Sequence, residues 1–392
     1  MTLQRKAKIL FIVGTLLVLT ACGIKKEAKT VEISENLKIQ DLTSQPLTLP
    51  SEEVKGSDGT KWFRTKRTFY GAFDTVISLT FYTKTEEEFK KYADFAEREY
   101  ERLHQLYDKY HAYPGITNLY MVNNEAHKQP LVVEKDLFDL LQFAVKEQEF
   151  SHAKTQITMG ALLDVWHKYR EAAGVVENGE KKSEGTKAVL PSEQELQEAT
   201  EHENPGDLVL DPDKHTVFFK DGKISLDVGA VAKGYATQKI VDELRNMGLE
   251  HGLISAGGNV CTIGLPVDGR DTWSVGIQSP KDGEQLSDVL KIGADKAVVT
   301  SGDYQRYYEV DGKKYHHIID PETRYPGTLW HSVTVIASDS GLADFLSTAL
   351  FLATPQEQEQ IRNKYEEQGI SIEYLGIDTN QKEVKTSGII RE

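Results

Sequence analysis

Residues 225–236 combine the small side chains, the helix start and the cation that binding of an anion requires. Their order, Ser-Leu-Asp-Val-Gly-Ala-Val-Ala-Lys-Gly-Tyr-Ala, predicts a strand, a Gly/Ala turn and then an amphipathic helix. Small residues let the backbone approach a phosphate, the helix N-terminus offers unpaired N–H groups, and Lys233 adds a full positive charge. The sequence is not a Walker A loop, because Lys233 is followed by Gly234 instead of Ser or Thr. A purely structural turn is the alternative interpretation.

Two further glycine clusters follow apolar runs. Residues 255–259 (Ser-Ala-Gly-Gly-Asn) come after Leu253 and Ile254, and residues 300–304 (Thr-Ser-Gly-Asp-Tyr) come after residues 297–299. Both are predicted to be loops after strands, where a free backbone can donate to a ligand while the sheet holds the loop in place. Each on its own is equally compatible with an ordinary turn.

Two adjacent histidines precede an aspartate in residues 315–321 (Tyr-His-His-Ile-Ile-Asp-Pro). If this stretch is a strand, His316 and His317 point to opposite faces, so they do not chelate one metal together. A histidine three residues before Asp320 is compatible with a base, a ligand contact or a hydrogen-bonded structural residue.

An aspartate and a threonine four residues apart suggest a site for a hard cation. Asp344 and Thr348 lie in a predicted helix over residues 341–352, which places both side chains on one face. Carboxylate and hydroxyl oxygens suit magnesium or calcium and do not suit zinc. The alternative is an Asp packed near the helix start with a Thr that bonds back to the backbone.

The elements that must position these residues alternate between strands and helices. The apolar pattern predicts strands over residues 74–82, 216–219, 273–277 and 332–337, and helices over residues 86–109, 137–151, 231–247 and 341–352. This mixture predicts an α+β domain. Cys261 lies in the apolar run 259–263 and is interpreted as a buried strand residue.

The N-terminus has the pattern of a secretory signal. Arg5, Lys6 and Lys8 precede an apolar run over residues 9–19, which is too short for a typical membrane-spanning helix, and Leu-Thr-Ala-Cys-Gly follows. This pattern resembles a bacterial lipoprotein signal, which implies cleavage after residue 21 and attachment of lipid, palmitate included, to Cys22. We therefore expect an extracytoplasmic body held at the membrane by its lipid. An uncleaved anchor or a soluble secreted protein is the alternative.

Composition limits the remaining possibilities. Residues 22–66 are polar and weakly periodic, so they are expected to form a tether, and residues 67–392 are expected to form the folded domain. The formal net charge is −15, with 61 acidic and 46 basic residues, which argues against a nucleic-acid partner. An anionic ligand then requires a local device such as a metal ion or a glycine-rich backbone.

Taken together and in order, these stretches resemble the ApbE family of FAD:protein FMN transferases, from about residue 68 to residue 352. The matching pieces are residues 226–236, 256–259, 300–304, 317–321 and 332–337, then Asp344 and Thr348, with weaker matches at residues 108–110, 118–123 and 158–166. The resemblance implies a single α+β flavin transferase domain behind the signal and tether.

The same resemblance implies roles for individual residues. Magnesium would be held by Asp344, Thr348 and the carbonyl oxygen of Ala230, and His317 and Lys233 would be catalytic. The FAD site would be lined by Phe73, Thr158, Asp227, Ala230, Lys233, Gly257, Gly258, Ser301, Gly302, Asp303 and Ile318.

The implied reaction splits FAD and attaches its FMN half to a Thr or Ser of an acceptor flavoprotein, releasing AMP. Magnesium, Lys233 and the helix N-terminus would stabilise charge on the phosphate oxygens, and His317 would accept the hydroxyl proton. Two alternatives share this site: a magnesium-dependent FAD pyrophosphatase, in which water attacks, and a lipid-anchored flavin-binding protein.

Overall fold

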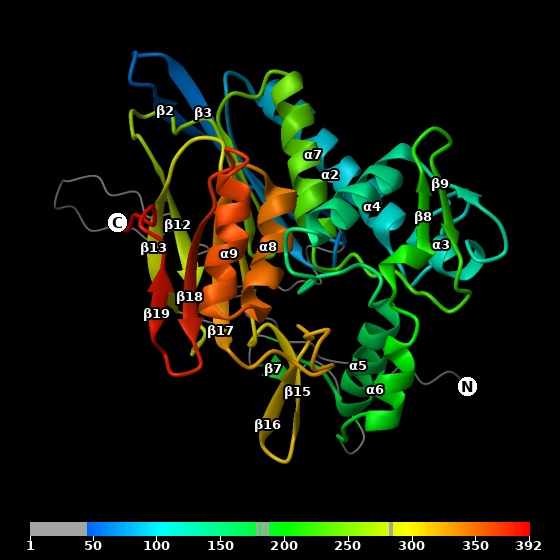
Figure 1. The fold of residues 1–392 in the computed structure, drawn as a ribbon. Coiled ribbons are helices and arrows are strands. Elements are labelled where there is room, and N and C mark those ends of the chain that lie inside the picture. Colours follow the sequence, from blue (N-terminus) through cyan, green and yellow to red (C-terminus); the bar gives the residue numbers. More distant parts are fainter. Residues whose placement is uncertain (1–44, 178–179, 182–184, 186–187, 282–284) are drawn as a thin grey trace, which may run out of the picture.

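A ten-stranded antiparallel sheet forms the centre of the molecule in a computed structural model that describes residues 45–177, 180–181, 185, 188–281 and 285–392 (Figure 1). Its strands are β1 (Leu47–Thr48), β2 (Glu52–Lys55), β3 (Lys61–Tyr70), β4 (Val76–Thr83), β10 (Gly252–Ala256), β11 (Asn259–Ile263), β14 (Ala297–Gly302), β17 (Trp330–Ala337), β18 (Glu373–Asp378) and β19 (Glu383–Lys385). They follow the order β1-β3-β4-β10-β11-β14-β17-β18-β19, and β2 also pairs with β3.

Most of the helices belong to the segment that leaves the sheet after β4 and returns at β10. They are α2 (Glu86–Tyr107), α3 (Leu119–Glu125), α4 (Lys135–Gln148), α5 (Gly160–Ala173), α6 (Glu193–Thr200) and α7 (Ala232–Asn246), and α8 (Ser340–Leu352) and α9 (Pro355–Glu366) follow later. Strands β4 and β10 are neighbours in the sheet, so this long excursion begins and ends at the same place. It brings α7 back beside α8, which packs on β14 and β17.

Three smaller sheets surround the centre. They are β5 (Leu131–Val132) with β9 (Thr216–Phe219) and β8 (Leu208–Asp211); the hairpin β12 (Trp273–Gln278) and β13 (Leu286–Ile292); and β16 (Lys313–His316), β15 (Arg306–Val310), β6 (Val176–Glu177) and β7 (Glu180–Lys181). The last of these sheets lies near α5 and α6, at the bottom of the view in Figure 1. Its aromatic core centres on Trp166 and Tyr308, separate from the main core.

Helix α8 is almost entirely buried. Its sequence, SGLADFLSTALFL, is apolar on every side, and Thr348 is the one residue of the helix that is not buried. Asp339 caps the helix by accepting the amide hydrogen of Leu342 at 2.7 Å. Burying the ionisable residue Asp344 in such a helix is costly unless its carboxylate is paired and hydrogen-bonded.

The helical predictions agree well with the fold, and the α+β class is confirmed. The predicted helix over residues 86–109 is α2, residues 231–247 contain α7, and residues 341–352 match α8 within one residue. Cys261 is buried in β11, as expected. No helix within the described part of the chain is both long and apolar enough to cross a membrane.

Three predictions were wrong. The tether does not extend to residue 66, because β1, β2 and the first part of β3 already belong to the central sheet. Residues 300–302 lie inside β14 and not in the loop after it. Ser225 forms only an isolated bridge to Met159 in place of a strand. Cys22 and the signal segment lie outside the described residues.

Candidate functional site

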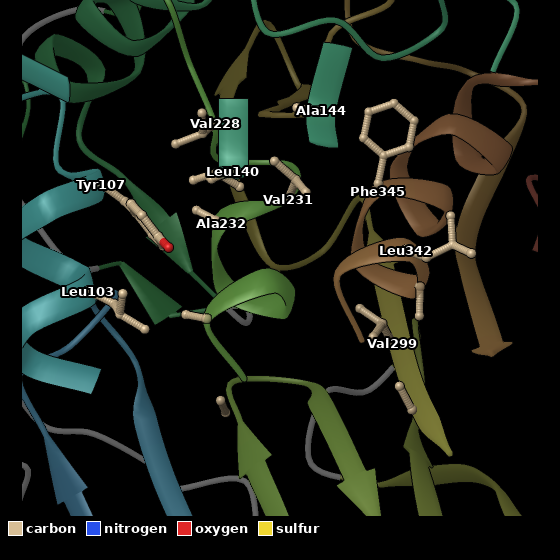
Figure 2. Packing of buried hydrophobic residues seen from close by; sticks show 14 of the residues in the cluster. Leu103, Tyr107, Leu140, Ala144, Val228, Val231, Ala232, Val299, Leu342 and Phe345 are labelled. Atoms are coloured by element: carbon tan, nitrogen blue, oxygen red, sulfur yellow. The ribbon is translucent and has the colours of Figure 1, made fainter. Parts of the chain in front are cut away.

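Apolar anchors hold the turn that leads into α7. Val228, Val231 and Ala232 are buried, and Figure 2 shows them between Tyr107 of α2 and Phe345 of α8. Their burial leaves the polar and small residues of the turn toward the surface, with Gly229 exposed and Ala230 and Lys233 partly exposed. The cap residue Val231 has no side-chain acceptor for the first helical amides. The positive end of the α7 dipole lies at this turn, where a bound anion would share it with the Asp344 carboxylate, which already accepts the Gly234 amide hydrogen.

Asp344 contacts the first turn of α7 from the neighbouring helix. Its Oδ2 accepts the amide hydrogen of Gly234 at 2.7 Å, and its Oδ1 lies 3.7 Å from the Lys233 ammonium nitrogen. The glycine is required here, because a Cβ at position 234 would lie 2.4 Å from the Asp344 Cβ. Burial raises the pKa of Asp344, and Lys233 only partly offsets that effect. The carboxylate is therefore under-compensated and available to a further cation.

A cluster of hydroxyl groups joins β14 to α8 on the turn of α8 that follows Asp344. Ser301 Oγ on β14 lies 2.8 Å from Ser347 Oγ and 3.3 Å from Thr348 Oγ1, both on α8. Ser347 Oγ also donates to the carbonyl oxygen of Asp344 at 2.8 Å. Because Ser301 lies in a strand, the sheet fixes this hydroxyl cluster relative to α8.

The second glycine cluster forms a two-residue hairpin turn between β10 and β11. Gly257 and Gly258 both have positive φ values, 54° and 88°, which suits a hairpin turn of this length. A Cβ at Gly257 would lie 2.0 Å from Thr75 Oγ1, so glycine is also needed for close packing. Next to the turn, Asn259 accepts the Ser340 hydroxyl at 2.9 Å, while its Nδ2 is buried without a hydrogen-bond partner.

His317 follows directly after β16, and its ring is oriented by the backbone. Its Nδ1 lies 3.2 Å from the carbonyl oxygen of Arg306, which can only accept, so Nδ1 carries the proton and Nε2 holds the lone pair. Burial, together with the charges of Arg306 and Arg170, lowers the pKa of His317 well below its usual value. The imidazole is therefore neutral at pH 7 and can accept a proton at Nε2.

The neighbouring residues of the His-His motif have structural contacts. His316 Nε2 donates to the carbonyl oxygen of Gly327 at 2.8 Å, and its Nδ1 accepts the amide hydrogen of Ile318 at 3.2 Å. His316 is buried at the end of β16, whereas His317 is partly buried and lies after the strand, so the strand geometry considered for both residues applies only to His316. At the end of β14, Asp303 Oδ2 lies 2.6 Å from Nδ1 of His331.

Asp227 is held by a lysine that the sequence reasoning did not select. Its Oδ1 accepts the amide hydrogen of Gly229 at 2.7 Å, and its Oδ2 accepts from the Lys109 ammonium at 3.1 Å. Lys109 also lies 2.8 Å from Asp164 Oδ1. Burial raises the pKa of Asp227, but Lys109 and the Gly229 amide hydrogen bond together outweigh burial, so the net pKa lies below the usual value. Lys109 lies in residues 108–110, one of the stretches that resemble the ApbE family more weakly. Nothing in that local sequence indicates that its ammonium contacts Asp164 and Asp227.

Two predicted site residues have contacts of their own, apart from the Asp344 cluster. The Phe73 amide donates to His104 Nδ1 at 3.2 Å, and its backbone has a positive φ of 53°. Thr158 is fully buried, and its hydroxyl donates to the carbonyl oxygen of Glu203 at 2.7 Å. The structure thus pairs Lys233 with Asp344 and Ser301 with Thr348, on neighbouring turns of α8, whereas Phe73 and Thr158 have no described contact with these pairs.

The oxygen donors fit a hard divalent cation. Among the described residues, no three His, Cys, Asp or Glu side chains lie together in a group that could hold a metal ion. One buried carboxylate, a nearby hydroxyl and the carbonyl oxygens of the α7 turn match the way Mg²⁺ is bound, by few protein ligands together with substrate phosphate and water. Asp344, Thr348 and Ala230 can supply these oxygens.

The protein has an α+β fold. Its candidate site combines the start of α7, Lys233 and nearby oxygen donors, a set of groups suited to an anion and a hard cation. The profile of the ApbE family matches residues 73–372, and the chain belongs to this family.

Named relatives agree with this assignment. The FAD:protein FMN transferase of Klebsiella pneumoniae (strain 342) is 32% identical over 232 residues, which cover 59% of this chain and 66% of that protein. The protein of the same name from Treponema pallidum (strain Nichols) is 34% identical over 239 residues, covering 59% and 63%. The matched segments thus span slightly less than two thirds of either relative.

The structural likeness extends further along the chain. The crystal structure of the ApbE protein from Thermotoga maritima superposes with a TM-score of 0.69 at 24% identity, covering 86% of this chain and 97% of that one. The flavin transferase ApbE from Vibrio cholerae superposes with a TM-score of 0.65 at 21% identity, covering 86% and 98%. At these identities the superpositions establish the fold.

Proposed function

We propose that this chain is an FAD:protein FMN transferase, which splits FAD with the help of Mg²⁺, attaches FMN to a Thr or Ser of an acceptor protein and releases AMP. Family membership and the name shared by the relatives support the reaction class. The observation that carries the proposal is the neutral, backbone-oriented imidazole of His317 in the same fold as the anion-binding start of α7.

The start of α7 is suited to the pyrophosphate of FAD. The helix dipole and the Lys233 ammonium both favour negative charge, and the exposed Gly229 lets a phosphate approach the backbone. As charge builds on the phosphate oxygens during transfer, these fixed positive groups stabilise the transition state more than the ground state.

The cation site adds a further positive charge next to the pyrophosphate. Asp344, Thr348 and the carbonyl oxygen of Ala230 would hold Mg²⁺, which when bound neutralises phosphate charge and orients the phosphate oxygens. Lys233 lies 3.7 Å from Asp344 Oδ1, so its ammonium and the cation share this carboxylate.

The acceptor hydroxyl oxygen attacks the phosphorus atom of the FMN half. The new O–P bond forms while the P–O bond to AMP breaks, and AMP leaves with the bridging oxygen. His317 Nε2 takes the hydroxyl proton, because Nδ1 is already committed to the Arg306 carbonyl. No other reactant is needed for the atoms and charges to balance.

The remaining predicted residues would line the FAD site. Asp227 and its Gly229 bond shape the α7 turn, and the hairpin at Gly257 and Gly258 has exposed backbone. The other residues assigned to this lining are Phe73, Thr158, Ser301, Gly302, Asp303 and Ile318.

We also propose that the domain works outside the cytoplasm and is held at the membrane by lipid on Cys22. The support is the charged, apolar and small-residue pattern of residues 5–23. Labelling cells with a radioactive or clickable palmitate and comparing the chain with a Cys22→Ala variant tests this, since the label should disappear with the cysteine.

Intact-mass spectrometry of an acceptor tests the reaction. The chain is incubated with FAD, Mg²⁺ and a candidate surface flavoprotein, and the expected result is an acceptor mass gain of one FMN less water, with AMP released. The His317→Ala protein should bind FAD but transfer FMN far more slowly. Free FMN and AMP without modified acceptor would favour a pyrophosphatase, and intact FAD bound to the chain would favour a flavin-binding protein.

A further inference from the structure

A buried ammonium joins two carboxylates beside the turn that precedes α7. Lys109 Nζ lies 2.8 Å from Asp164 Oδ1 and 3.1 Å from Asp227 Oδ2. The side chains of Lys109 and Asp227 are 7% and 13% exposed, whereas that of Asp164 is 46% exposed. We propose that Lys109 is a positioning residue, which holds Asp227 and through it the α7 turn in the geometry that binds FAD. This inference rests on the proposed function.

The backbone that carries Lys109 is held by two buried polar residues. Asp108 accepts the amide hydrogen of Tyr110 at 2.6 Å and the hydroxyl of Tyr113 at 2.9 Å. Asn118 Nδ2 donates to three carbonyl oxygens, those of Gln105, Asp108 and His111. Both residues are buried, so the position from which the lysine reaches Asp227 is rigid. Such support is expected where one charged group must be placed accurately.

Three separate parts of the fold meet at the ammonium. Lys109 follows the end of α2, Asp164 lies on α5, and Asp227 precedes α7. Lys109 and Asp227 are 118 residues apart in sequence. The lysine therefore ties the α7 turn to two elements that are themselves packed in place.

The charges in this network depend on one another. Burial lowers the pKa of Lys109, but Asp227 and Asp164 raise it by more, so the ammonium stays charged. If the ammonium is lost, Asp227 keeps its partly buried charge without a cationic partner and faces a second carboxylate. Two carboxylates that share one cation repel each other when it is removed.

Asp227 connects two kinds of backbone. The residue before it is held by hydrogen bonds, and the turn after it is exposed, so the Lys109 bond to Asp227 affects the geometry of that turn. Before Asp227, the side-chain amide of Asn123 bonds both the N–H and the carbonyl of Leu226, at 2.8 and 3.0 Å. After it, Asp227 Oδ1 holds the amide of the exposed Gly229. A rotated Asp227 would release the Gly229 amide, which immediately precedes Ala230.

Replacing Lys109 with methionine keeps the side-chain length and removes the charge. FAD binding is measured by titration calorimetry with the full-length chain and Mg²⁺, and FAD cleavage by AMP release. We expect the Kd and KM for FAD to rise about 10- to 100-fold, as for loss of a charge-assisted hydrogen bond. The kcat at saturating FAD should change little, because the lysine acts on binding geometry and not on the reacting atoms.

A second substitution distinguishes positioning from mere packing. In the double variant Lys109→Met, Asp164→Asn, the repelling neighbour of Asp227 is neutral, so much of the lost FAD affinity should return. The control is Lys135→Met, since Lys135 is exposed and its ion pair is with Asp139 on the same helix, α4. It should bind FAD like the parent.

Three outcomes would contradict the role of Lys109 as a positioning residue. Unchanged FAD affinity in Lys109→Met, with a parent chain that binds FAD and releases AMP, would overturn this inference alone. Equal loss of affinity and of melting temperature in the single and double variants would also overturn it, because the lysine would then be structural. A parent chain that neither binds FAD nor releases AMP would overturn the proposed function and this inference with it.

Discussion

Replacing Asp344 with asparagine should separate stability from activity. The side chain is 7% exposed, and its Oδ2 accepts the Gly234 amide hydrogen at 2.7 Å. Asparagine has nearly the same shape and retains an oxygen for that amide. It removes the negative charge that a divalent cation requires, so FAD cleavage should fall about 100-fold or more.

Two opposing energies determine the effect on the free energy of unfolding: the attraction between Asp344 and Lys233, and the cost of burying the carboxylate. Coulomb's law at an effective dielectric constant of about 20 gives roughly 4 kcal/mol for unit charges 3.7 Å apart, and the partly exposed Lys233 lowers this through screening. Burying the carboxylate costs several kcal/mol. Because burial raises the pKa of Asp344 despite Lys233, the cost of burial exceeds the attraction to the lysine. The Asp344→Asn protein should therefore be more stable by about 1 kcal/mol, or roughly 2 °C in Tm.

The pH dependence has a defined sign. A pKa raised above 3.8 means that the folded chain binds this proton more tightly than the unfolded chain. Stability from this group is thus complete at low pH and is lost as the pH rises through the folded-state pKa. The advantage of the asparagine variant should be absent near about pH 3 and present at about pH 7, where the carboxylate is ionised.

Calorimetric melting without Mg²⁺, together with AMP release from FAD in its presence, measures both effects. The matched control is Glu147→Gln, because Glu147 is also a buried carboxylate but accepts its hydrogen bond from the Tyr365 hydroxyl of α9, at 2.6 Å, in place of an amide of α7. It should keep activity. Retained FAD cleavage in Asp344→Asn would refute the cation site. Lost cleavage with a Tm several degrees lower would refute the conclusion that the cost of burying the carboxylate exceeds its attraction to Lys233.

Three other perturbations test the fold around the site. Burial raises the pKa of Glu203 from 4.5 to about 7, so stability should fall as the pH rises between these two values, and Glu203→Gln should flatten the urea midpoint over that range. In Gly234→Ala the new Cβ would lie 2.3 Å from the Ser340 carbonyl oxygen, which should force α7 from α8, lower stability by about 1–3 kcal/mol and reduce activity; thermal melts and AMP release measure this. Deletion of residues 1–60 should lower Tm relative to deletion of residues 1–44, since only the longer deletion removes β1 and β2.

Local patterns in the sequence predicted the elements with strong periodicity. Helices α2, α7 and α8 were found within about two residues because apolar spacing and capping residues act over one or two turns. The short polar strands β1 and β2 were missed, since they become strands only by pairing with β3. Residues 300–302 were assigned to a loop because small polar residues are typical of turns, whereas their pairing with β17 makes them a strand.

The sequence by itself determined the family, the α+β class and the types of residue available for chemistry: a lysine at a helix start, a carboxylate and hydroxyl one turn apart, and a histidine after a strand. These depend on order and local spacing. The tertiary structure decided which of them meet. Asp344 reaches Gly234 across 110 residues, and Lys109 reaches Asp227 across 118. Contacts of that range arise because β4 and β10 pair and return α7 to α8, and no local pattern encodes that packing.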